Sequence, residues 1–401
     1  MSSLPPKATH QQTKTYNQQL VFKAIYDQGE ISRADLARLT GLTRVTVSEI
    51  VAELIEKSLV AEVGFGPSAG GKNPILLGVV ADAYHLIGVD LASDEFRGAV
   101  VNLRGEIRHT RSVPLPANDG AESLQQVYAL IDDLVAQTEA PLLGIGIGTP
   151  GLLDTEHGVV RRAVNLGWQD LPLGSLLQAR YNLPVYIGND SHVTALAEQI
   201  FGAGLGAANL AVLRVGRGIG AGVILNGQLY QGESFGAGEI GHISIDPHGA
   251  RCRCGNTGCL ETIGSARAIV QRARQFAQAE PGSQLHRQPE DAPLTLGEVL
   301  SAFTAGDEVA RRVVTDSARA VGFAAAILAS TLNIRRILLV GSVTRFGQPW
   351  LDGVRAELQS RTLPALSQQT EITLGETAAN GVILGASALL LTCELGLNLA
   401  R

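Results

Sequence analysis

The chain has 401 residues, which is too long for one ordinary domain and long enough for two or three. Apolar residues make up 45% of it and charged residues 17%, and this composition excludes disordered and fibrous proteins. The net charge is −6, yet residues 1–80 hold 8 Lys and Arg against 7 Asp and Glu, whereas the rest of the chain holds 24 against 31. A segment that binds a polyanion is therefore expected only at the N-terminus.

The sequence predicts a cytoplasmic protein without a membrane span. Residues 1–19 are polar and lack the apolar core of a signal peptide. The most apolar stretches, 320–332 and 381–391, are shorter than the roughly 20 residues that cross a bilayer. Their small residues recur at helical spacing, which is typical of buried helices.

Residues 15–78 are predicted to form a winged helix-turn-helix domain, preceded by a flexible arm at residues 1–14. Apolar residues at helical spacing in 20–25 predict a first helix. Ser32 and Thr43 are expected to cap two further helices, and two strands joined by a turn-rich tip follow them. The alternative is a small helical bundle that contacts other proteins.

The third of these helices is expected to enter the major groove of operator DNA. Its candidate DNA contacts, together with one residue at the tip of the wing, are Thr43, Arg44, Val45, Thr46, Ser48 and Lys72. Arginine pairs with guanine, hydroxyls reach bases or phosphates, and valine meets a thymine methyl group. Because the head is nearly neutral, binding is expected to need two heads, as in a homodimer or homotetramer.

Beyond the head, strands, glycine turns and helices alternate. A strand–turn–strand unit is predicted twice, near 86–103 and near 210–226, with helices after each unit. This repetition predicts an α/β fold of two related lobes that face a cleft. The first lobe is expected to span 79–190 together with 382–401, and the second lobe is expected to span 191–381.

Three of the four cysteines lie within eight residues, which is typical of a metal site rather than of a secreted disulfide scaffold. Cys252, Cys254 and Cys259 with His242 form a Cys3His set, the usual composition of a closed structural zinc site. One Zn²⁺ per chain is therefore the expected cofactor. His248 is a competing ligand because it lies nearer the cysteines, and three buried free thiols are the alternative to a metal site.

These motifs resemble the ROK family of repressors, open reading frames and sugar kinases. The cysteine string is the most specific match. The other matches are GTPG at 148–151, NLGW at 165–168, GND at 188–190, GEIGH at 238–242 and CLE at 259–261. The resemblance covers nearly the whole chain and implies an actin-like, hexokinase-type pair of lobes behind the winged helix-turn-helix.

The resemblance also implies a monosaccharide site. The positions that match the family's sugar contacts are Asn165, Asn189, Asp190, Glu239, His242 and Glu261. Carboxylates and amides suit vicinal hydroxyls, since they supply several fixed acceptors and donors. Each of these residues taken alone could instead be a cap or turn group. Asp190 additionally matches the catalytic base of the family's kinases.

The segments that would bind ATP depart from the kinase pattern. Asp90 is followed by LASDE instead of a Gly-Gly-Thr turn, so glycines are missing and two carboxylates would repel phosphate. Arg217 stands in a glycine loop where the kinases usually carry threonine, and VGSV at 340–343 replaces a glycine-rich turn near the adenosine site. A glycine loop alone is a weak signal for phosphate binding.

The sequence therefore predicts a sugar-responsive transcriptional regulator, in the form of a repressor, with no catalytic residue. Its partners are operator DNA and a monosaccharide or sugar-phosphate effector, with no membrane. One alternative is an ATP-dependent sugar kinase that carries a DNA-binding head and uses Asp190 as its base. Another is a protein-responsive regulator whose cleft is vestigial.

Overall fold

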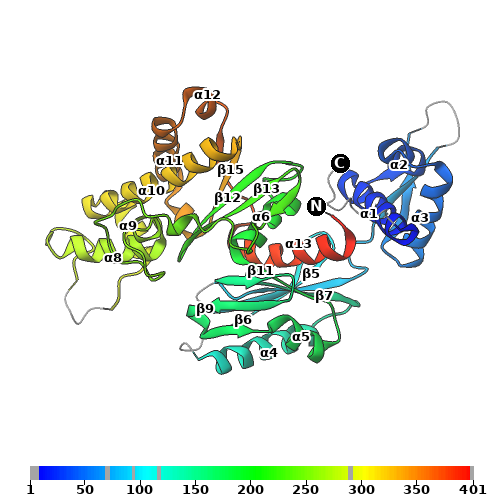
Figure 1. Ribbon diagram of the computed structural model, residues 1–401, viewed down its shortest axis with the longest axis horizontal. Helices are drawn as coiled ribbons and strands as arrows, with labels where there is room; N and C mark the ends of the chain where they lie inside the picture. Colours follow the sequence, from blue (N-terminus) through cyan, green and yellow to red (C-terminus); the bar gives the residue numbers. More distant parts are fainter. Residues whose placement is uncertain (1–8, 68–72, 93–94, 115–118, 288–291, 398–401) are drawn as a thin grey trace, which may run out of the picture.

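The computed structural model describes residues 9–67, 73–92, 95–114, 119–287 and 292–397. It shows a small N-terminal head beside two α/β lobes (Figure 1). The head and the paired lobes are those that the sequence predicts.

The head has the predicted three helices and hairpin, and also a short strand between the first two helices that the sequence analysis does not predict. Its elements are α1 (His10–Gln28), β1 (Ile31–Ser32), α2 (Arg33–Thr40), α3 (Arg44–Glu56), β2 (Val60–Phe65) and β3 (Ile75–Val79). β3 lies between β1 and β2 in an antiparallel sheet. The side chains of Ser32 and Thr43 cap α2 and α3 as predicted, each by accepting a hydrogen bond from the backbone N–H three residues on.

The first helix begins earlier than the sequence analysis places it. α1 starts at His10, inside the segment 1–14 predicted to be a flexible arm, of which residues 1–8 lie outside the described residues. Thr9 and Gln12 form a capping box, in which each side chain accepts a hydrogen bond from the other residue's backbone N–H. This cap starts the helix in a polar stretch that has no apolar periodicity to reveal it.

The two lobes repeat one sheet topology. The first lobe contains β4 (His85–Asp90), β5 (Glu95–Asn102), β6 (Ile107–Pro114), α4 (Gly120–Ala136), β7 (Leu142–Thr149), β8 (Leu152–Asp154), β9 (Val159–Ala163), η1 (Val164–Leu166), β10 (Trp168–Leu171), α5 (Leu173–Tyr181) and β11 (Val185–Asn189). The second contains β12 (Leu210–Val215), β13 (Ile219–Leu225), β14 (Gln228–Tyr230), η2 (Ile240–His242), α7 (Glu261–Gly264), α8 (Ala266–Ala277), α9 (Leu296–Thr304), α10 (Glu308–Leu332), β15 (Arg336–Val340), η3 (Ser342–Phe346), α11 (Gly347–Arg361), α12 (Pro364–Ser367) and β16 (Glu371–Leu374).

In each lobe, three consecutive strands form an antiparallel meander, and two later strands add in parallel beside its first strand. The strand orders are β11-β7-β4-β5-β6 and β14-β13-β12-β15-β16. The predicted strand–turn–strand repeat therefore corresponds to β4–β5 and β12–β13. A third small sheet, of order β10-β9-β8, belongs to the first lobe.

Two helices, α6 (Asp190–Phe201) and α13 (Gly381–Leu395), pack against each other between the two sheets (Figure 1). A Cβ atom on Gly385 of α13 would lie only 1.9 Å from Val193 O of α6. A Cβ atom on Gly146 of β7 would lie 2.0 Å from Ala386 O of α13. Glycine is required at both positions because backbone meets backbone there. The two helices and the first sheet therefore form one closely packed unit.

The far end of α13 belongs to the core of the head. Leu390, Leu391 and Leu397 lie in the same buried cluster as Phe22 and other apolar residues of α1. The joint also contains polar contacts: Tyr26 Oη donates to Leu103 O at 2.8 Å, and Arg104 Nη1 donates to Tyr26 O at 2.7 Å. The head is thus packed onto the first lobe rather than tethered to it.

Helix α10 contains the apolar stretch 320–332 and is longer than that stretch. By length and composition alone it could cross a membrane. However, 67% of its most apolar window is buried inside the protein, and it packs against α11 and α8. α10 is therefore a buried core helix, as the sequence predicts for the stretch 320–332.

Candidate functional site

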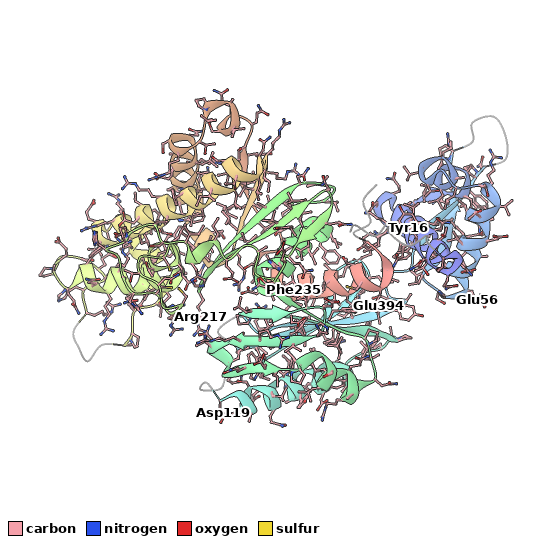
Figure 2. All side chains as sticks on the ribbon, in the orientation of Figure 1. Tyr16, Glu56, Asp119, Arg217, Phe235 and Glu394 are labelled. Atoms are coloured by element: carbon pink, nitrogen blue, oxygen red, sulfur yellow. The ribbon has the colours of Figure 1, made fainter. Side chains whose placement is uncertain are left out.

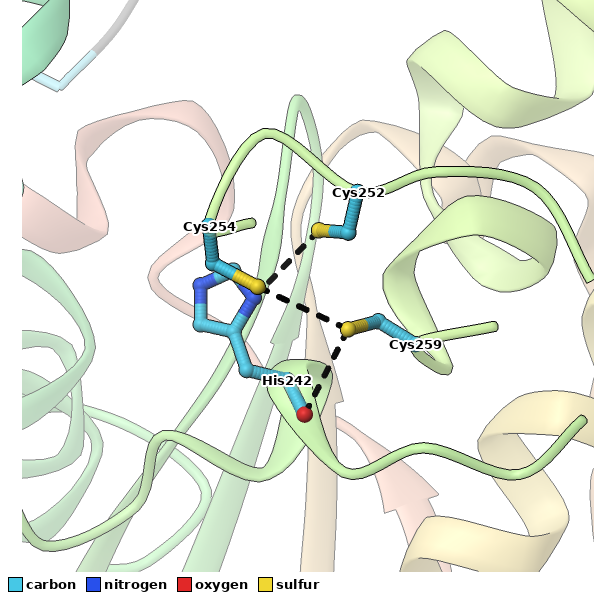
Figure 3. A group of neighbouring side chains, drawn as sticks. All are labelled: His242, Cys252, Cys254 and Cys259. Atoms are coloured by element: carbon cyan, nitrogen blue, oxygen red, sulfur yellow. Dashed lines mark hydrogen bonds between the residues drawn. The ribbon is translucent and has the colours of Figure 1, made fainter. Parts of the chain in front are cut away.

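Four side chains that the sequence assigns to zinc come together in the second lobe (Figure 3). The ligand atoms of His242, Cys252, Cys254 and Cys259 all lie within 4.8 Å of one another. The Cys254 and Cys259 sulfurs are 3.6 Å apart, and Cys252 Sγ is 3.7 Å from His242 Nδ1. Around a tetrahedral Zn²⁺ with bonds of about 2.3 Å to sulfur and about 2.1 Å to nitrogen, these distances would be roughly 3.8 and 3.6 Å. The set fits Zn²⁺, and His248 lies outside it.

The loop between η2 and α7 can form this cluster because of its glycines. Gly258 has a φ of +67°, and a Cβ atom there would lie 1.5 Å from Asp246 O. Gly255 has a φ of +103°. Residues other than glycine rarely adopt these backbone conformations. The glycines therefore allow the tight turn that directs three sulfurs inward.

The orientation of the imidazole also suits a metal, and burial affects the titration of the thiols. Burial raises the pKa of the Cys259 thiol to about 12, and it raises the pKa of Cys252 as well. A bound cation favours the thiolate forms and would reverse this effect. Because His242 Nδ1 faces the sulfurs, Nε2 is left on the other side of the ring, 3.7 Å from Glu239 Oε2.

A cavity of about 400 Å³ lies between the two lobes, and all six side chains predicted to bind sugar line it. They come from η1, the end of β11, the start of α6, η2 with the residue before it, and the start of α7: Asn165, Asn189, Asp190, His242, Glu239 and Glu261. The structure thus brings together the polar groups that the resemblance selects. His242 belongs both to the cavity and to the metal cluster.

The end of β11 and the start of α6 present two of these groups. Asn189 caps α6, since its Oδ1 accepts hydrogen bonds from the backbone N–H groups of Ser191 and His192. Asp190 follows it, and both of its carboxylate oxygens have partners. Oδ2 accepts from Arg214 Nη1 at 2.8 Å, and Oδ1 accepts from Ser191 N at 2.8 Å. The carboxylate is therefore held in a fixed orientation.

The opposite wall holds the other carboxylates. Glu261 Oε2 accepts a hydrogen bond from the backbone N–H of Ile219 at 3.0 Å, and its Oε1 lies 3.6 Å from Arg267 Nη2. Burial raises the pKa of Glu239, and the negative charges of Asp190 and Glu261 add to this rise. The cavity thus combines carboxylate and amide acceptors, which suits a ligand rich in hydroxyl groups.

Sequence analysis missed the arginines of this cavity. Five of them line it: Arg162, Arg214, Arg217, Arg253 and Arg267. Figure 2 labels Arg217 between the lobes. Only Arg217 draws attention in the sequence, because it stands within a glycine loop. The others come from separate elements, and no local pattern connects them.

The glycines of the second loop have structural reasons to be present. A Cβ atom on Gly218 would lie 2.5 Å from Glu261 Oε2, and one on Gly220 would lie 2.3 Å from Ser191 Oγ. Gly341 has a φ of +101°, and a Cβ atom there would lie 2.5 Å from Val215 O. The backbone conformation at Gly341 and the side chains next to Gly218 and Gly220 thus each favour glycine for structural reasons, so these glycines alone do not indicate a nucleotide site.

The first loop also differs from a phosphate cradle. Asp90 Oδ1 accepts a hydrogen bond from the backbone N–H of Ala92 at 2.8 Å. A backbone N–H group of the turn after β4 is thus already bonded within the protein. Ser93 and Asp94, the next two residues of the predicted departure, lie outside the described residues.

The candidate DNA contacts lie at the start of α3. Thr43, Arg44, Val45 and Ser48 are exposed, and Val45 retains 68% of its accessible surface. Among the described residues, the Arg44 guanidinium has no hydrogen-bond or ion-pair partner. Thr46 is half-buried. An exposed first turn with a free guanidinium suits contact with DNA bases or phosphates.

Two observations concern side chains that the sequence predicts to contact DNA. The hydroxyl groups of Thr43 and Thr46 are 2.9 Å apart within the helix cap, and Ser48 Oγ donates to Arg44 O at 2.8 Å. These hydroxyls therefore already have partners within the helix. Lys72, predicted at the tip of the wing, lies outside the described residues.

Comparisons with known proteins find relatives of the two lobes alone and relatives that also include the N-terminal head. Residues 86–392 match the family model described as "ROK family". The xylose repressor of Caldicellulosiruptor bescii is 33% identical over 387 residues, which cover 96% of this chain and 97% of that protein. A glucokinase of Halalkalibacterium halodurans is 36% identical over 308 residues, which cover 75% of this chain and 93% of the enzyme. The repressor thus matches the head as well as the lobes.

A solved structure shows the same relationship. The crystal structure of a ROK family transcriptional regulator, a homologue of the Escherichia coli Mlc protein, superposes with a TM-score of 0.83 at 28% identity. The match covers 96% of this chain and 98% of that one. The likeness therefore includes the head.

Proposed function

Because the chain belongs to the ROK family, we propose that it is a transcriptional repressor whose binding to operator DNA is controlled by a monosaccharide or sugar phosphate held between its lobes. One observation carries this proposal. The six polar side chains assigned to sugar binding line a single cavity. Asp190, one of the six, starts a helix that packs on α13, and α13 ends in the core of the DNA-binding head.

This arrangement provides a path by which the ligand acts on DNA binding. Asn189 and Asp190 form the N-terminus of α6. α6 meets α13 in backbone contact at Val193 and Gly385, so the two helices move together. α13 then contributes Leu390 and Leu391 to the cluster that holds α1. A sugar that binds one arrangement of the lobes more tightly shifts the orientation of the head.

The proposed DNA contacts are those of the exposed first turn of α3, with Arg44 as the main base-reading side chain. A single head supplies few cations, since residues 1–80 hold 8 Lys and Arg against 7 Asp and Glu. We therefore propose a homodimer or homotetramer in the cytoplasm that places two heads on a two-fold operator. Light scattering of the purified protein tests this assembly.

A structural zinc ion completes the proposal. It would be held by His242 Nδ1 and by the sulfurs of Cys252, Cys254 and Cys259, at one ion per chain. Its chemistry here is structural: it would convert the thiols to thiolates and hold the loop in place. The ring of His242 is then fixed with its Nε2–H toward Glu239 and the cavity, where it donates to a sugar hydroxyl.

The glucokinase relative makes a sugar kinase the main alternative, and one observation argues against it. The segment after Asp90 lacks the glycines of a phosphate cradle. We therefore propose that the protein has no kinase activity and that Asp190 acts as a fixed acceptor for a sugar hydroxyl.

Selection of operator sequences from a random DNA library, followed by fluorescence anisotropy, tests the proposal. The selected DNA should bind the wild-type protein with submicromolar affinity, and one member of a panel of monosaccharides and sugar phosphates should change that affinity. Arg319→Ala, on the exposed face of α10, is a matched control and should behave as the wild type. Failure to select any sequence, or a sequence that no panel member affects, would contradict the proposal.

A further inference from the structure

The cavity between the lobes has more positive charge than a neutral sugar needs. Its described lining holds five arginines and three carboxylates, an excess of two positive charges. A zinc ion with three thiolates carries a net charge of −1 and would leave an excess of one. Cationic side chains gathered around one cavity repel one another, and a bound anion relieves this repulsion.

The carboxylates of the cavity do not neutralise every arginine. Asp190 pairs with Arg214 at 2.8 Å, and Glu261 approaches Arg267 at 3.6 Å. Arg253, by contrast, donates at 3.1 Å to Asn165 Oδ1, an uncharged partner. The Arg162 guanidinium has no partner among the described residues. Two guanidinium groups that line the cavity are therefore without a carboxylate.

Arg253 and Arg267 form the centre of this positive region. They line both the central cavity and a second one of about 290 Å³ on the other side of the zinc loop. Arg251 and Arg272 also line the second cavity. Burial lowers the pKa of Arg267, and the charge of nearby Arg253 lowers it further. These two arginines thus act on each other electrostatically where the cavities meet.

We propose, resting on the function proposed above, that the effector is a phosphorylated monosaccharide and that Arg253, Arg267 and Arg162 bind its phosphate. A phosphate monoester carries a charge close to −2 at neutral pH and has three acceptor oxygens. Guanidinium groups match these oxygens in geometry and stay charged in a partly buried site. The sugar hydroxyl groups then bind to the amide and carboxylate groups on the rest of the wall.

The same assignment explains how the ligand closes the cleft. Arg162 lies on β9 of the first lobe, whereas Arg253 and Arg267 belong to the second lobe. Arg253 already reaches across to Asn165 of the first lobe. A phosphate held from both sides favours the closed arrangement, which gives the ligand the differential affinity that control of DNA binding requires.

Isothermal titration calorimetry of the full-length, zinc-loaded protein tests the assignment. The probes are glucose, mannose and N-acetylglucosamine, each beside its 6-phosphate, with inorganic phosphate alone as a further probe. At least one sugar phosphate should bind 10-fold or more tighter than its parent sugar, and its affinity should fall as salt rises. Inorganic phosphate should bind far more weakly than that sugar phosphate.

Three variants distinguish the loss of a positive charge from damage to the structure. Arg253→Gln and Arg162→Gln are exposed changes and should each weaken the sugar phosphate roughly 10- to 100-fold, the range for a lost charge-assisted hydrogen bond. They should weaken the parent sugar by a much smaller factor, so that the preference for the phosphorylated form is reduced. Arg319→Gln, outside both cavities, should match the wild type. Zinc content measured for Arg253→Gln shows that the loop is intact.

The outcomes distinguish this inference from the proposed function. A neutral sugar that binds as tightly as its phosphate and still changes operator affinity would overturn the inference and leave the proposed function standing. Inorganic phosphate that binds as tightly as the sugar phosphate would also overturn the inference, because the site would then recognise an anion alone. Absence of binding by every sugar and sugar phosphate would overturn both.

Discussion

Replacement of Cys254 by serine should release the zinc ion. The loop that forms one wall of the sugar cavity should then lose its structure. The loop between η2 and α7 has no helix or strand of its own among the described residues, only two isolated bridges, Ser244 with Cys259 and Arg251 with Thr257. Its backbone hydrogen bonds, such as those from Cys252 N to Asn256 O and from Gly258 N to Ala250 O, mostly join residues of the loop to one another. Structural zinc sites supply about 10–16 kcal/mol to the folding of small peptides. The loop is therefore expected to lose its structure without the metal, while the lobe cores remain folded.

The effect on the cavity follows from which groups the loop holds. It carries Arg253, which contacts Asn165 across the cleft, and it fixes the ring of His242. Loss of a group that orients a metal site or its ligand commonly weakens affinity about 10- to 100-fold, and we expect a loss of this size in sugar affinity. The head shares no residue with this loop, so operator affinity without sugar should stay within about 2-fold.

Metal analysis, hydrogen exchange over residues 243–260 and calorimetric titration of the best-binding sugar or sugar phosphate measure these effects. Cys393→Ser is the matched control, since Cys393 is an exposed thiol on α13 outside the metal cluster. It should retain one zinc ion per chain and wild-type sugar affinity. Equal zinc retention by the Cys254→Ser and Cys393→Ser proteins would refute the ligand assignment.

Three further predictions concern the other parts of the molecule. Arg44→Ala should weaken specific operator binding by about 1–3 kcal/mol in an anisotropy titration at matched salt and leave sugar affinity unchanged. A coupled ADP-release assay across common hexoses and pentoses should give only background, and turnover of about 1–100 per second would show a kinase. Gly385→Ala, whose new Cβ atom would meet Val193 O, should lower the free energy of unfolding by about 1–3 kcal/mol in urea; an unchanged midpoint would contradict the close packing of α6 and α13.

The sequence predicts the metal cluster and the helix-turn-helix best, because the residues that define them are close together in the chain. Cys252, Cys254 and Cys259 lie within one short loop, and glycines beside them signal a tight turn. Ser32 and Thr43 likewise signal the helix starts that they cap. The capping box of Thr9 with Gln12 is also a local signal, and it marks the start of α1 that the predicted boundary at residue 15 misses.

The cavity is harder to predict, because its residues are distant in sequence. The six polar groups could be selected only through the resemblance to a known family, which fixes their positions in a shared fold. Arg162, Arg214, Arg253 and Arg267 are absent from those motifs, and no spacing relates them. Their common position becomes visible only once both lobes are folded.

The packing of the head onto the first lobe also cannot be predicted from the sequence. The sequence predicts an amphipathic first helix in a separate head domain, and Phe22 and Tyr26 lie on this helix. In the structure their contacts include Leu103 and the cluster with Leu390 and Leu391 of α13, more than 350 residues away along the chain. Hydrophobic periodicity indicates that a face is buried, but it does not indicate which element covers it.

The central claim, that one chain couples a sugar cavity to operator binding, is tested most directly by operator affinity measured with and without the best-binding sugar or sugar phosphate. The wild-type protein should change its operator affinity by about 10-fold or more, within the range of ordinary allosteric coupling. Glu239→Gln should bind the operator like the wild type and lose the response, whereas Arg44→Ala should bind the operator weakly and keep its sugar affinity. A Glu239→Gln protein that responds at wild-type ligand concentrations would contradict the account.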